Sequence, residues 1–518
     1  MKLNQASILW SVKHLFKESD NDLFPRPYEL SIINEFSNQV ISACKEIDIT
    51  NYKWKASRRF VVPKDDYSFR NATQLDILDS ILIAAIIREY GHLIEAKRIA
   101  ERAEIVFSYR FKPLSDGTLY SNNNAWESFW ESCRKSVAQF NSVVMCDISD
   151  FYNQISLHTI ENQLEICGFP APITKKIKDL IIHLTARASK GIPIGPHISH
   201  LLAEMSLIPF DNQLQLRDIK FKRYVDDIVI FCDDAKDAKI KLNLIADILD
   251  KEQRLILQKS KTRILDKREF EEICNQNLLE DIAYNEEEQI VKIIKRHSGG
   301  SAYTKVKLSE LSDDEIAELS EENIIELFKK YLNLSSPNYE KLKWLYRRLS
   351  QLGIPHAVDF SLQNFELLIP ALNDVCLYIN SCAENYSSDW RDVGKEIIDI
   401  LKDRIISSNQ FYSIALYNLF VYNGSLNHFS ILIKNFESAP ENIKRKIFLA
   451  SMNYDSEGWL RGFKEHYPKF DSWTKRSFLI AASKLPEEER EFFYRGVKAS
   501  LLQYDILERI IIDWGNEQ

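Results

Sequence analysis

The chain has 518 residues, enough for two to four domains that each bury a core, and its 45% hydrophobic and 27% charged content is typical of a globular protein. A formal net charge of −8 excludes a uniformly basic surface for nucleic acid, although a local basic cleft is compatible with that total. The eight cysteines contain no Cys-x-x-Cys pair and no apolar run has the length of a membrane span, so we expect no zinc site, no disulfide framework, no membrane segment and a cytoplasmic protein.

The first 50 residues have apolar positions at helical spacing, interrupted by two prolines. A basic stretch with interleaved aromatic residues covers residues 52–70, where we predict a β-hairpin of Phe60–Val62 and Tyr67–Arg70. Basic and aromatic residues together suit phosphates and bases. Charged residues also protect the edge strands of ordinary sheets, so both interpretations stay open at this point.

A strongly apolar helix is predicted over residues 73–106, with Thr73 as its cap. Residues 108–124 are typical of a loop, because they combine Gly, Pro, Ser and Asn. An aromatic helix follows from Trp126, and we expect its rings to pack in a core.

A buried strand, Val143 to Cys146, leads directly into Asp147. A carboxylate at the end of a strand is held rigidly, as a metal site requires. Asp150 is expected to cap the next turn or to offer its backbone to a phosphate. Further along, residues 190–196 form a Gly/Pro loop before a helix; such a loop lets a backbone approach a ligand, and it is also an ordinary connection.

Two strands with a tight turn between them are predicted over residues 221–231, and Asp226 and Asp227 lie at the turn. Adjacent carboxylates repel each other and ionise most easily beside a cation. Oxygen ligands of this kind suit Mg²⁺, which proteins hold through one or two carboxylates and substrate phosphates. A solvated Asp-Asp turn is the plainer alternative. A helix, Ala235 to Gln253, leads to a segment containing Lys261.

From about residue 305 onward almost every segment is predicted to be helical. Ser312 and Glu315 form a capping box, and Pro337, Pro440 and Pro486 lie at expected helix starts. Short helices at fairly even spacing favour a HEAT-like α-solenoid. No sharp period is present, so an irregular helical bundle stays open.

Five features follow one another in a fixed order, and that order resembles the fingers and palm of reverse transcriptases over residues 50–270. They are the basic hairpin, the strand that ends in Asp147, the Gly/Pro loop with its helix, Tyr-Val-Asp-Asp, and Leu-x-Leu-x-x-x-Lys-Thr. The resemblance implies an α+β protein in three parts. Residues 1–120 would form N-terminal helices and fingers, residues 121–290 the palm, and residues 291–518 an all-α HEAT-like domain.

The resemblance also implies a nucleotidyltransferase with two Mg²⁺ ions, for which Mn²⁺ could substitute. Asp147, Asp226 and Asp227 would be the metal-binding and catalytic carboxylates, and Lys261 would lie near the leaving group. Paired metals activate the attacking 3′-oxygen and stabilise the leaving pyrophosphate.

Further residues match the nucleotide-binding positions of that family. Lys64 and Arg70 would grip the incoming triphosphate. Tyr152 would exclude a ribose 2′-hydroxyl, so that deoxynucleoside triphosphates are the substrates. Ile194 and Gly195 would lie beside the nucleotide.

Ile194 departs from the family pattern, because template-directed members usually have Gln there, and Pro196 replaces a Ser. A Gln amide can hydrogen-bond near the templating base and Ile cannot, so we expect weak or absent template use. This departure and the helical tail resemble the bacterial abortive-infection reverse transcriptases that defend against phage. The resemblance implies untemplated, protein-primed DNA synthesis, a single-stranded product attached covalently to the protein, and a homo-oligomer.

Two alternatives are weighed against this hypothesis. One is a conventional RNA-templated reverse transcriptase of the retron or group II intron type, although an RNA partner predicts a more basic surface than this acidic chain offers. The other is a non-catalytic scaffold that binds a phage or host protein. The three carboxylates, with Lys64, Arg70 and Lys261, favour catalysis, since a scaffold does not require them.

Overall fold

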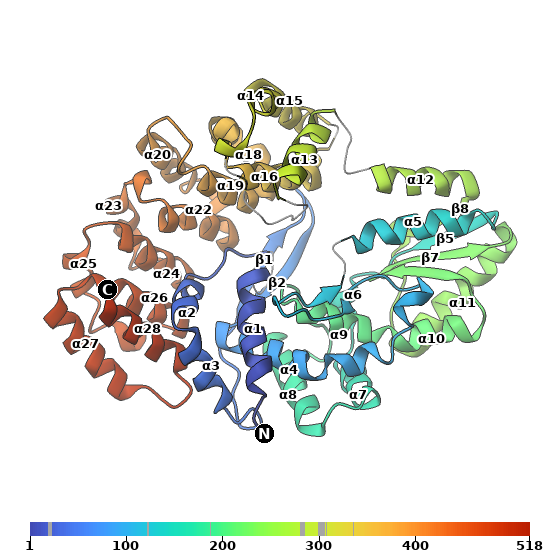
Figure 1. Ribbon diagram of the computed structural model, residues 1–518, viewed down its shortest axis with the longest axis horizontal. Coiled ribbons are helices and arrows are strands. Elements are labelled where there is room, and N and C mark those ends of the chain that lie inside the picture. The colour runs from blue at the N-terminus through green and yellow to red at the C-terminus, as the bar shows by residue number, and fades with distance from the viewer. Residues whose placement is uncertain are drawn as a thin grey trace. The chain divides into compact units, whose positions relative to one another are not determined.

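The computed structural model describes residues 1–18, 23–121, 124–186, 188–279, 285–298, 306, 308–334 and 336–518. The chain forms two compact units (Figure 1). The first comprises Met1–Asp22, Ser37–Arg59 and Ala72–Asp281, and the second comprises Leu23–Phe36, Phe60–Asn71 and Ile282–Gln518. The second unit therefore includes two N-terminal segments in addition to the C-terminal half. Among the described residues, no helix has the length and apolarity needed to cross a membrane.

A four-stranded antiparallel sheet lies at the centre of the first unit. Its order is β6-β7-β5-β8, and the strands are β6 (Phe221–Tyr224), β7 (Asp227–Cys232), β5 (Ser142–Cys146) and β8 (Arg263–Asp266). The two central strands are apolar on both faces, which is the pattern of a sheet covered on both sides. The predicted strands before Asp147 and around the Asp-Asp turn are confirmed.

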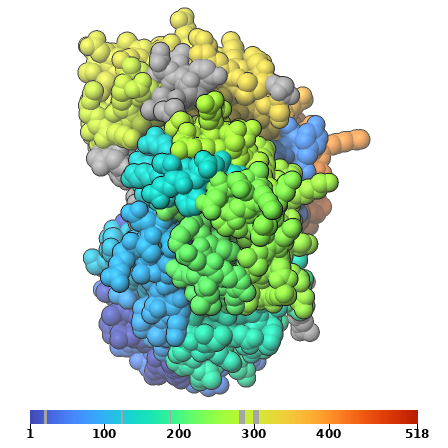
Figure 2. All heavy atoms as spheres, turned by 90° about the vertical axis from the view of Figure 1, so that its right-hand side faces the viewer, coloured from blue at the N-terminus to red at the C-terminus, as the bar shows by residue number. Residues whose placement is uncertain are grey.

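Helices cover both faces of this sheet. On one face lie α5 (Ala125–Val137) and α12 (Lys267–Leu279); on the other, α11 (Ala235–Gln253) packs against the sheet and against α10 (Ile208–Leu216) (Figure 1). Figure 2 shows the unit from outside, with α12 in yellow-green beside α5 in cyan.

The core under α5 and α12 consists of Phe129, Trp130, Cys133, Val137, Val143, Val229, Phe231, Phe270 and Cys274. Full burial of one such aromatic side chain is worth about 1.5–3 kcal/mol. The expected core role of the α5 rings holds for Phe129 and Trp130, whereas Trp126 is partly exposed.

The rest of the first unit is helical. Its helices are α1 (Gln5–Glu18), α3 (Ser37–Lys45), α4 (Ile77–Glu95), α6 (Phe151–Gln154), α7 (Leu157–Cys167), α8 (Ala171–Leu184) and α9 (Ile198–Ser206). Helix α4 begins later than the sequence predicted. Thr73 belongs to a strand, and the cap is Asp76, whose side chain accepts a hydrogen bond from Leu78 N at 3.0 Å. The predicted loop at residues 108–124 contains two short paired strands, β3 (Arg110–Phe111) and β4 (Tyr120–Ser121).

The predicted basic hairpin is present as β1 (Arg58–Pro63) and β2 (Phe69–Gln74). Its second strand starts two residues later than expected, because Asp65 folds the turn onto itself. The Asp65 side chain accepts hydrogen bonds from Tyr67 N at 2.9 Å and Ser68 N at 2.7 Å. The tip of the hairpin belongs to the second unit. There Tyr339 donates its hydroxyl hydrogen bond to Asp66 at 2.8 Å, and Lys343 Nζ donates to Lys64 O at 3.1 Å.

The second unit is almost entirely helical, as predicted. Six helices form a row in which each packs against the next: α16 (Tyr339–Leu352), α19 (Leu372–Ser381), α22 (Gln410–Tyr422), α24 (Glu441–Ala450), α26 (Ser472–Ala481) and α28 (Ile506–Glu517). The remaining helices are α2 (Glu29–Glu35), α13 (Asn285–Ser298), α14 (Asp313–Glu318), α15 (Glu321–Leu332), α17 (Val358–Gln363), α18 (Phe365–Leu368), α20 (Trp390–Ile400), α21 (Arg404–Ser408), α23 (Phe429–Leu432), α25 (Glu457–Arg461) and α27 (Glu487–Ser500). The predicted capping box of Ser312 and Glu315 is confirmed at the start of α14.

A buried ion cluster fixes α2 to the C-terminal helices. Glu29 is 1% exposed; its Oε2 accepts a hydrogen bond from Arg445 Nη2 at 2.6 Å and its Oε1 lies 3.3 Å from Arg476 Nε. Both guanidinium groups lie over the ring of Trp473, and Glu508 contacts Arg476. Burial alone would raise the pKa of Glu29, but the charges of the two arginines outweigh it and lower the pKa to about 2.

This cluster predicts an acid-sensitive component of stability. Because the pKa of Glu29 is lower in the folded than in the unfolded protein, its contribution is complete above about pH 4.5 and is lost as the pH falls toward 2. We expect Glu29→Gln to lower the free energy of unfolding by about 3–5 kcal/mol at pH 7, because two buried arginines lose their partner. The free energies of unfolding of the variant and the wild type should become more alike as the pH falls from 5 to 2.5. Urea titrations followed by tryptophan fluorescence measure both values.

The control for this experiment is Glu326→Gln. Glu326 pairs with Lys330 on the surface of α15 with a side chain that is 61% exposed, so its removal should change little at either pH. A Glu29→Gln protein whose stability relative to wild type does not depend on pH would contradict the assignment.

Candidate active site

The strand register brings two of the three predicted carboxylates face to face. Strands β5 and β7 pair antiparallel with Cys146 opposite Ile228, so the next pair in register is Asp147 and Asp227. Residues directly opposite each other point to the same face, with Cβ atoms about 4.5–5.5 Å apart. Asp226 immediately precedes Asp227 at the turn between β6 and β7. The sheet therefore gathers Asp147, Asp226 and Asp227 at one end of its central strands.

Burial, and then repulsion between neighbouring charges, raises the pKa of two of these carboxyl groups. The pKa of Asp226 is raised to about 7, first by burial and then by the charges of Asp147 and Asp227. The pKa of Asp227 is raised to about 6, again by burial and then by the charge of Asp147. A concentration of negative charge that the protein itself neutralises only in part favours a bound cation.

Lys261 supplies part of that neutralisation. Its Nζ donates a hydrogen bond to Asp147 Oδ2 at 2.5 Å. Burial alone would lower the pKa of Lys261, but the hydrogen bond and the three aspartate charges raise it. The segment before Lys261 lies along the continuation of β5, since Gln258 N donates to Asp147 O at 2.8 Å and Ile256 O accepts from Ser149 N at 2.9 Å. Lys261 therefore lies beside the carboxylates, and its role near the leaving group stays a prediction.

The donor chemistry fits Mg²⁺, although no ready-made metal cage is present. Carboxylate oxygens are the ligands that Mg²⁺ takes from proteins, and it usually adds water and substrate phosphates to them. Within the described part of the chain, no three histidine, cysteine or acidic groups converge closely enough to enclose an ion by themselves. The Lys261 ammonium group lies on an Asp147 oxygen that a metal would need. Asp147, Asp226 and Asp227 could thus hold a metal once Lys261 turns away.

The turn that carries the aspartates has a strained backbone, which hydrogen bonds to neighbouring residues stabilise. Val225 has a φ of +53°, in the left-handed region that costs an L-residue about 1–2 kcal/mol. Two hydrogen bonds compensate: Val225 N donates to Ser108 Oγ at 2.9 Å, and Arg223 Nη1 donates to Val225 O at 2.8 Å. Strain of this kind concentrates at functional sites, where surrounding contacts maintain it.

Arg223 belongs to a buried charge network that the sequence did not predict. It is 0% exposed; its Nε donates to Asp211 Oδ1 at 2.8 Å and its Nη1 lies 3.1 Å from Glu204 Oε2. Arg98 Nη2 donates to the same Glu204 oxygen at 2.8 Å. Burial alone would lower the pKa of Arg223, but the two carboxylates raise it. One signal was visible in the sequence: Glu204 interrupts the apolar face formed by Leu201 and its neighbours.

The other predicted nucleotide-binding residues of the first unit lie in one connected region. Tyr152, on α6, is linked to the Gly/Pro loop because Ile192 N donates to Tyr152 O at 2.9 Å. Ile194 O in turn accepts a hydrogen bond from Thr73 N in β2 at 2.7 Å. Gly195 has a φ of +126°, and a Cβ there would lie 2.5 Å from Thr73 O. The close contact with β2 and the positive φ are therefore enough to explain why residue 195 is a glycine.

Lys64 and Arg70, the predicted triphosphate-binding pair, belong to the hairpin tip in the second unit. Lys64 is exposed, and Arg70 is partly buried with an Nε that has no hydrogen-bond partner in the described structure. An unsatisfied buried guanidinium nitrogen is costly unless a ligand supplies its acceptor. Their place beside the carboxylates stays a prediction.

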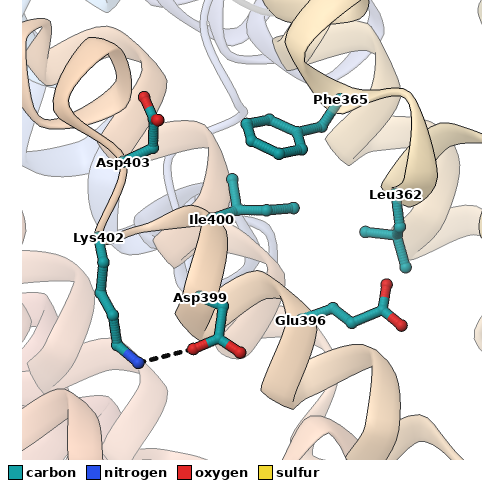
Figure 3. A pocket seen from close by; sticks show the side chains of 7 residues that line it. All are labelled: Leu362, Phe365, Glu396, Asp399, Ile400, Lys402 and Asp403. Atoms are coloured by element: carbon teal, nitrogen blue, oxygen red, sulfur yellow. Dashed lines mark hydrogen bonds and ion pairs between the residues drawn. The ribbon is translucent and has the colours of Figure 1, made fainter.

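A pocket of about 470 Å³ in the second unit is lined by apolar and acidic side chains (Figure 3). Its apolar side consists of Leu362, Phe365 and Ile400, and its polar side carries three carboxylates. The single cation that lines it, Lys402, is paired with Asp399 at 2.6 Å. This pocket contains none of the residues that the sequence predicted for metal or nucleotide binding, so the carboxylates beside the sheet remain the candidate site.

An antiparallel sheet packed against helices, with one carboxylate after a central strand and two on the adjacent turn, is the arrangement predicted for the palm of a nucleotidyltransferase. Residues 64–273 match the family described as reverse transcriptase (RNA-dependent DNA polymerase), and the chain therefore contains a reverse transcriptase domain. No curated protein matches the sequence. Among solved structures, the chain is similar to telomerase from Candida albicans in complex with a TWJ fragment of telomeric RNA. That alignment has 10% sequence identity and a TM-score of 0.33, and it covers 77% of this chain and 71% of the other.

The raised pKa values predict that the carboxylates destabilise the metal-free protein. A folded pKa above the unfolded value imposes a cost that grows as the pH rises from about 4 through 7. We expect Asp226→Asn in EDTA to raise the free energy of unfolding by about 1–3 kcal/mol at pH 8, with a gain that shrinks toward pH 4. Thermal denaturation at both pH values measures the effect.

Magnesium supplies the second half of this experiment. Added Mg²⁺ should raise the melting temperature of the wild type and should have less effect on Asp226→Asn, because a ligand that binds only the folded state stabilises it. Asp247→Asn, which removes a surface partner of Lys251, is the matched control. A destabilised Asp226→Asn protein at pH 8 would contradict the assignment of repulsion.

Proposed function

We propose that the protein is a DNA polymerase of the reverse transcriptase type that adds deoxynucleotides by metal-dependent nucleotidyl transfer. The observation that carries this proposal is the pairing of β5 with β7, which places Asp147 opposite Asp227 and beside Asp226 in a domain of that family. Two Mg²⁺ ions held by these carboxylates would supply activation of the attacking oxygen and stabilisation of the leaving pyrophosphate.

Other residues would bind the triphosphate, select the sugar and contact the leaving phosphates. Asp147 would exchange its partner Lys261 for metal, and the released ammonium group would lie near the leaving phosphates. Lys64 and Arg70 would bind the triphosphate, which is supported by the unsatisfied Arg70 Nε. Tyr152 would select deoxyribose by steric exclusion of a 2′-hydroxyl.

We further propose that synthesis is untemplated and primed by a hydroxyl group of the protein, so that single-stranded DNA becomes attached to it. Ile194 supports this proposal, because it offers no amide where template-directed members usually have Gln. On the same grounds, together with the helical tail, we propose that the protein is a phage-defence enzyme of the abortive-infection type. The row of six packed helices from α16 to α28 supports a HEAT-like C-terminal domain, and such a domain suits self-association.

The test is an incorporation assay without added primer or template. Purified protein is incubated with Mg²⁺ and labelled deoxynucleotides, and the products are separated on a denaturing gel before and after protease treatment. We expect label that migrates with the protein and is released by protease. Asp226→Asn with Asp227→Asn should reduce incorporation by at least about 1,000-fold, since the electrostatic contribution of such groups is of this size or larger.

The matched control is Asp247→Asn, a surface carboxylate change that should leave incorporation unaltered. Incorporation only in the presence of an RNA template and a primer would overturn the untemplated mechanism and retain the polymerase. No incorporation under either condition would overturn the polymerase itself.

A further inference from the structure

Three aromatic side chains of the first unit contact one another in a row that ends at Tyr152. The Tyr152 hydroxyl and His200 Nδ1 are hydrogen-bonded at 2.6 Å. The His200 ring in turn stacks on Tyr109, with centroids 4.1 Å apart and ring planes 5° from parallel. Tyr152 and His200 come from α6 and α9, and Tyr109 precedes β3, so three separate segments converge on one ring.

Tyr109 is held in a conformation that it would not adopt unaided. Its φ is +44°, in the left-handed region that is costly for an aromatic residue. Arg98 supports that conformation, since its Nη1 donates a hydrogen bond to Tyr109 O at 2.8 Å and its Nη2 donates to Ser108 O at 2.7 Å. The buried charge network below the Asp-Asp turn therefore also aims the Tyr109 ring at His200.

His200 contacts Tyr152 as a neutral ring. Burial, and then the charge of His197, lower the pKa of His200 to about 3, so the imidazole stays uncharged at neutral pH. Burial raises the pKa of Tyr152 well above its usual range, and the charges of Tyr109, Glu204 and Asp226 add to this shift. His200 therefore stays neutral and Tyr152 stays protonated near pH 7. The hydrogen bond between them does not change with pH in this range.

We propose that His200, supported by Tyr109, is a positioning residue that fixes the Tyr152 ring against the sugar of the incoming nucleotide and thereby sets discrimination between deoxyribose and ribose. This inference rests on the proposed function. Exclusion of a single hydroxyl group requires a wall that does not move. A tyrosine ring held only by its own rotamer preference could turn aside, whereas one fixed at its far end through a hydrogen bond and a stacked ring cannot.

The test compares a matched pair of nucleotides, dATP and ATP, by two readouts: the ratio of their dissociation constants in calorimetry and the ratio of their kcat/KM values in incorporation. Discrimination is expressed as the dissociation constant of ATP divided by that of dATP, and as the kcat/KM of dATP divided by that of ATP. His200→Leu removes the hydrogen bond and should lower both of these ratios by roughly 3- to 10-fold, as expected for one hydrogen bond. Tyr152→Phe should have a similar effect, and the double variant should add little to either single change.

Two variants separate positioning from a general structural role. His200→Asn keeps a donor and an acceptor near the position of Nδ1, so it should restore most of the discrimination. Tyr120→Phe removes a hydroxyl group that donates to His197 O at 2.5 Å in the same cluster but does not touch Tyr152, so it should leave both ratios unchanged.

The outcomes are distinguishable from those of the polymerase assay. An unchanged ratio in His200→Leu, or equal binding of dATP and ATP by the wild type, would overturn the inference. A wild type that incorporates nothing would overturn the proposed function, while the ratio of dissociation constants would still decide whether His200 sets sugar discrimination.

Discussion

Repulsion among three carboxylates at the end of a buried sheet is the constraint on which the first unit depends. The pairing of β5 with β7 ends at Cys146 and Ile228, and continuing its register brings Asp147 and Asp227 opposite each other. The protein answers this repulsion from two directions. Lys261 contributes a positive charge on the open side, and below the turn Arg223 and Ser108 hold the strained Val225 in place. The three carboxylates thus destabilise the metal-free fold, and the same carboxylates are the groups that could bind a metal ion.

The sequence predicted those parts of the site that depend on local pattern. Asp147 follows an apolar strand and Asp226 lies at a hairpin turn, and both features are visible within about ten residues. The helix Ala235–Gln253 was predicted to the residue, because a capping aspartate precedes it and its apolar spacing is regular. Thr73 was misassigned because it directly precedes an apolar run, and strand pairing of β2 overrode that pattern.

Long-range polar contacts were beyond sequence reasoning. Glu204, Arg98 and Arg223 lie far apart along the chain, and only the fold shows that they share one buried network. His200 was hidden in the same way, since a single histidine on a largely apolar helix gives no sign of its partner. The grouping of the hairpin tip with the C-terminal helices also depends on contacts of high sequence separation, such as that between Tyr339 and Asp66.

The burial of Glu29 has a consequence for the order of events during synthesis of the chain. Its partners Arg445 and Arg476 follow it by 416 and 447 residues, so α2 cannot make these contacts until both arginines have left the ribosome. At a synthesis rate of about 5–20 residues per second, this delay is roughly 20–90 s. The hairpin tip waits in the same way for Tyr339. A nascent chain that stalls before residue 445 therefore leaves Glu29 without either arginine, and one that stalls before residue 339 also leaves the hairpin tip without Tyr339.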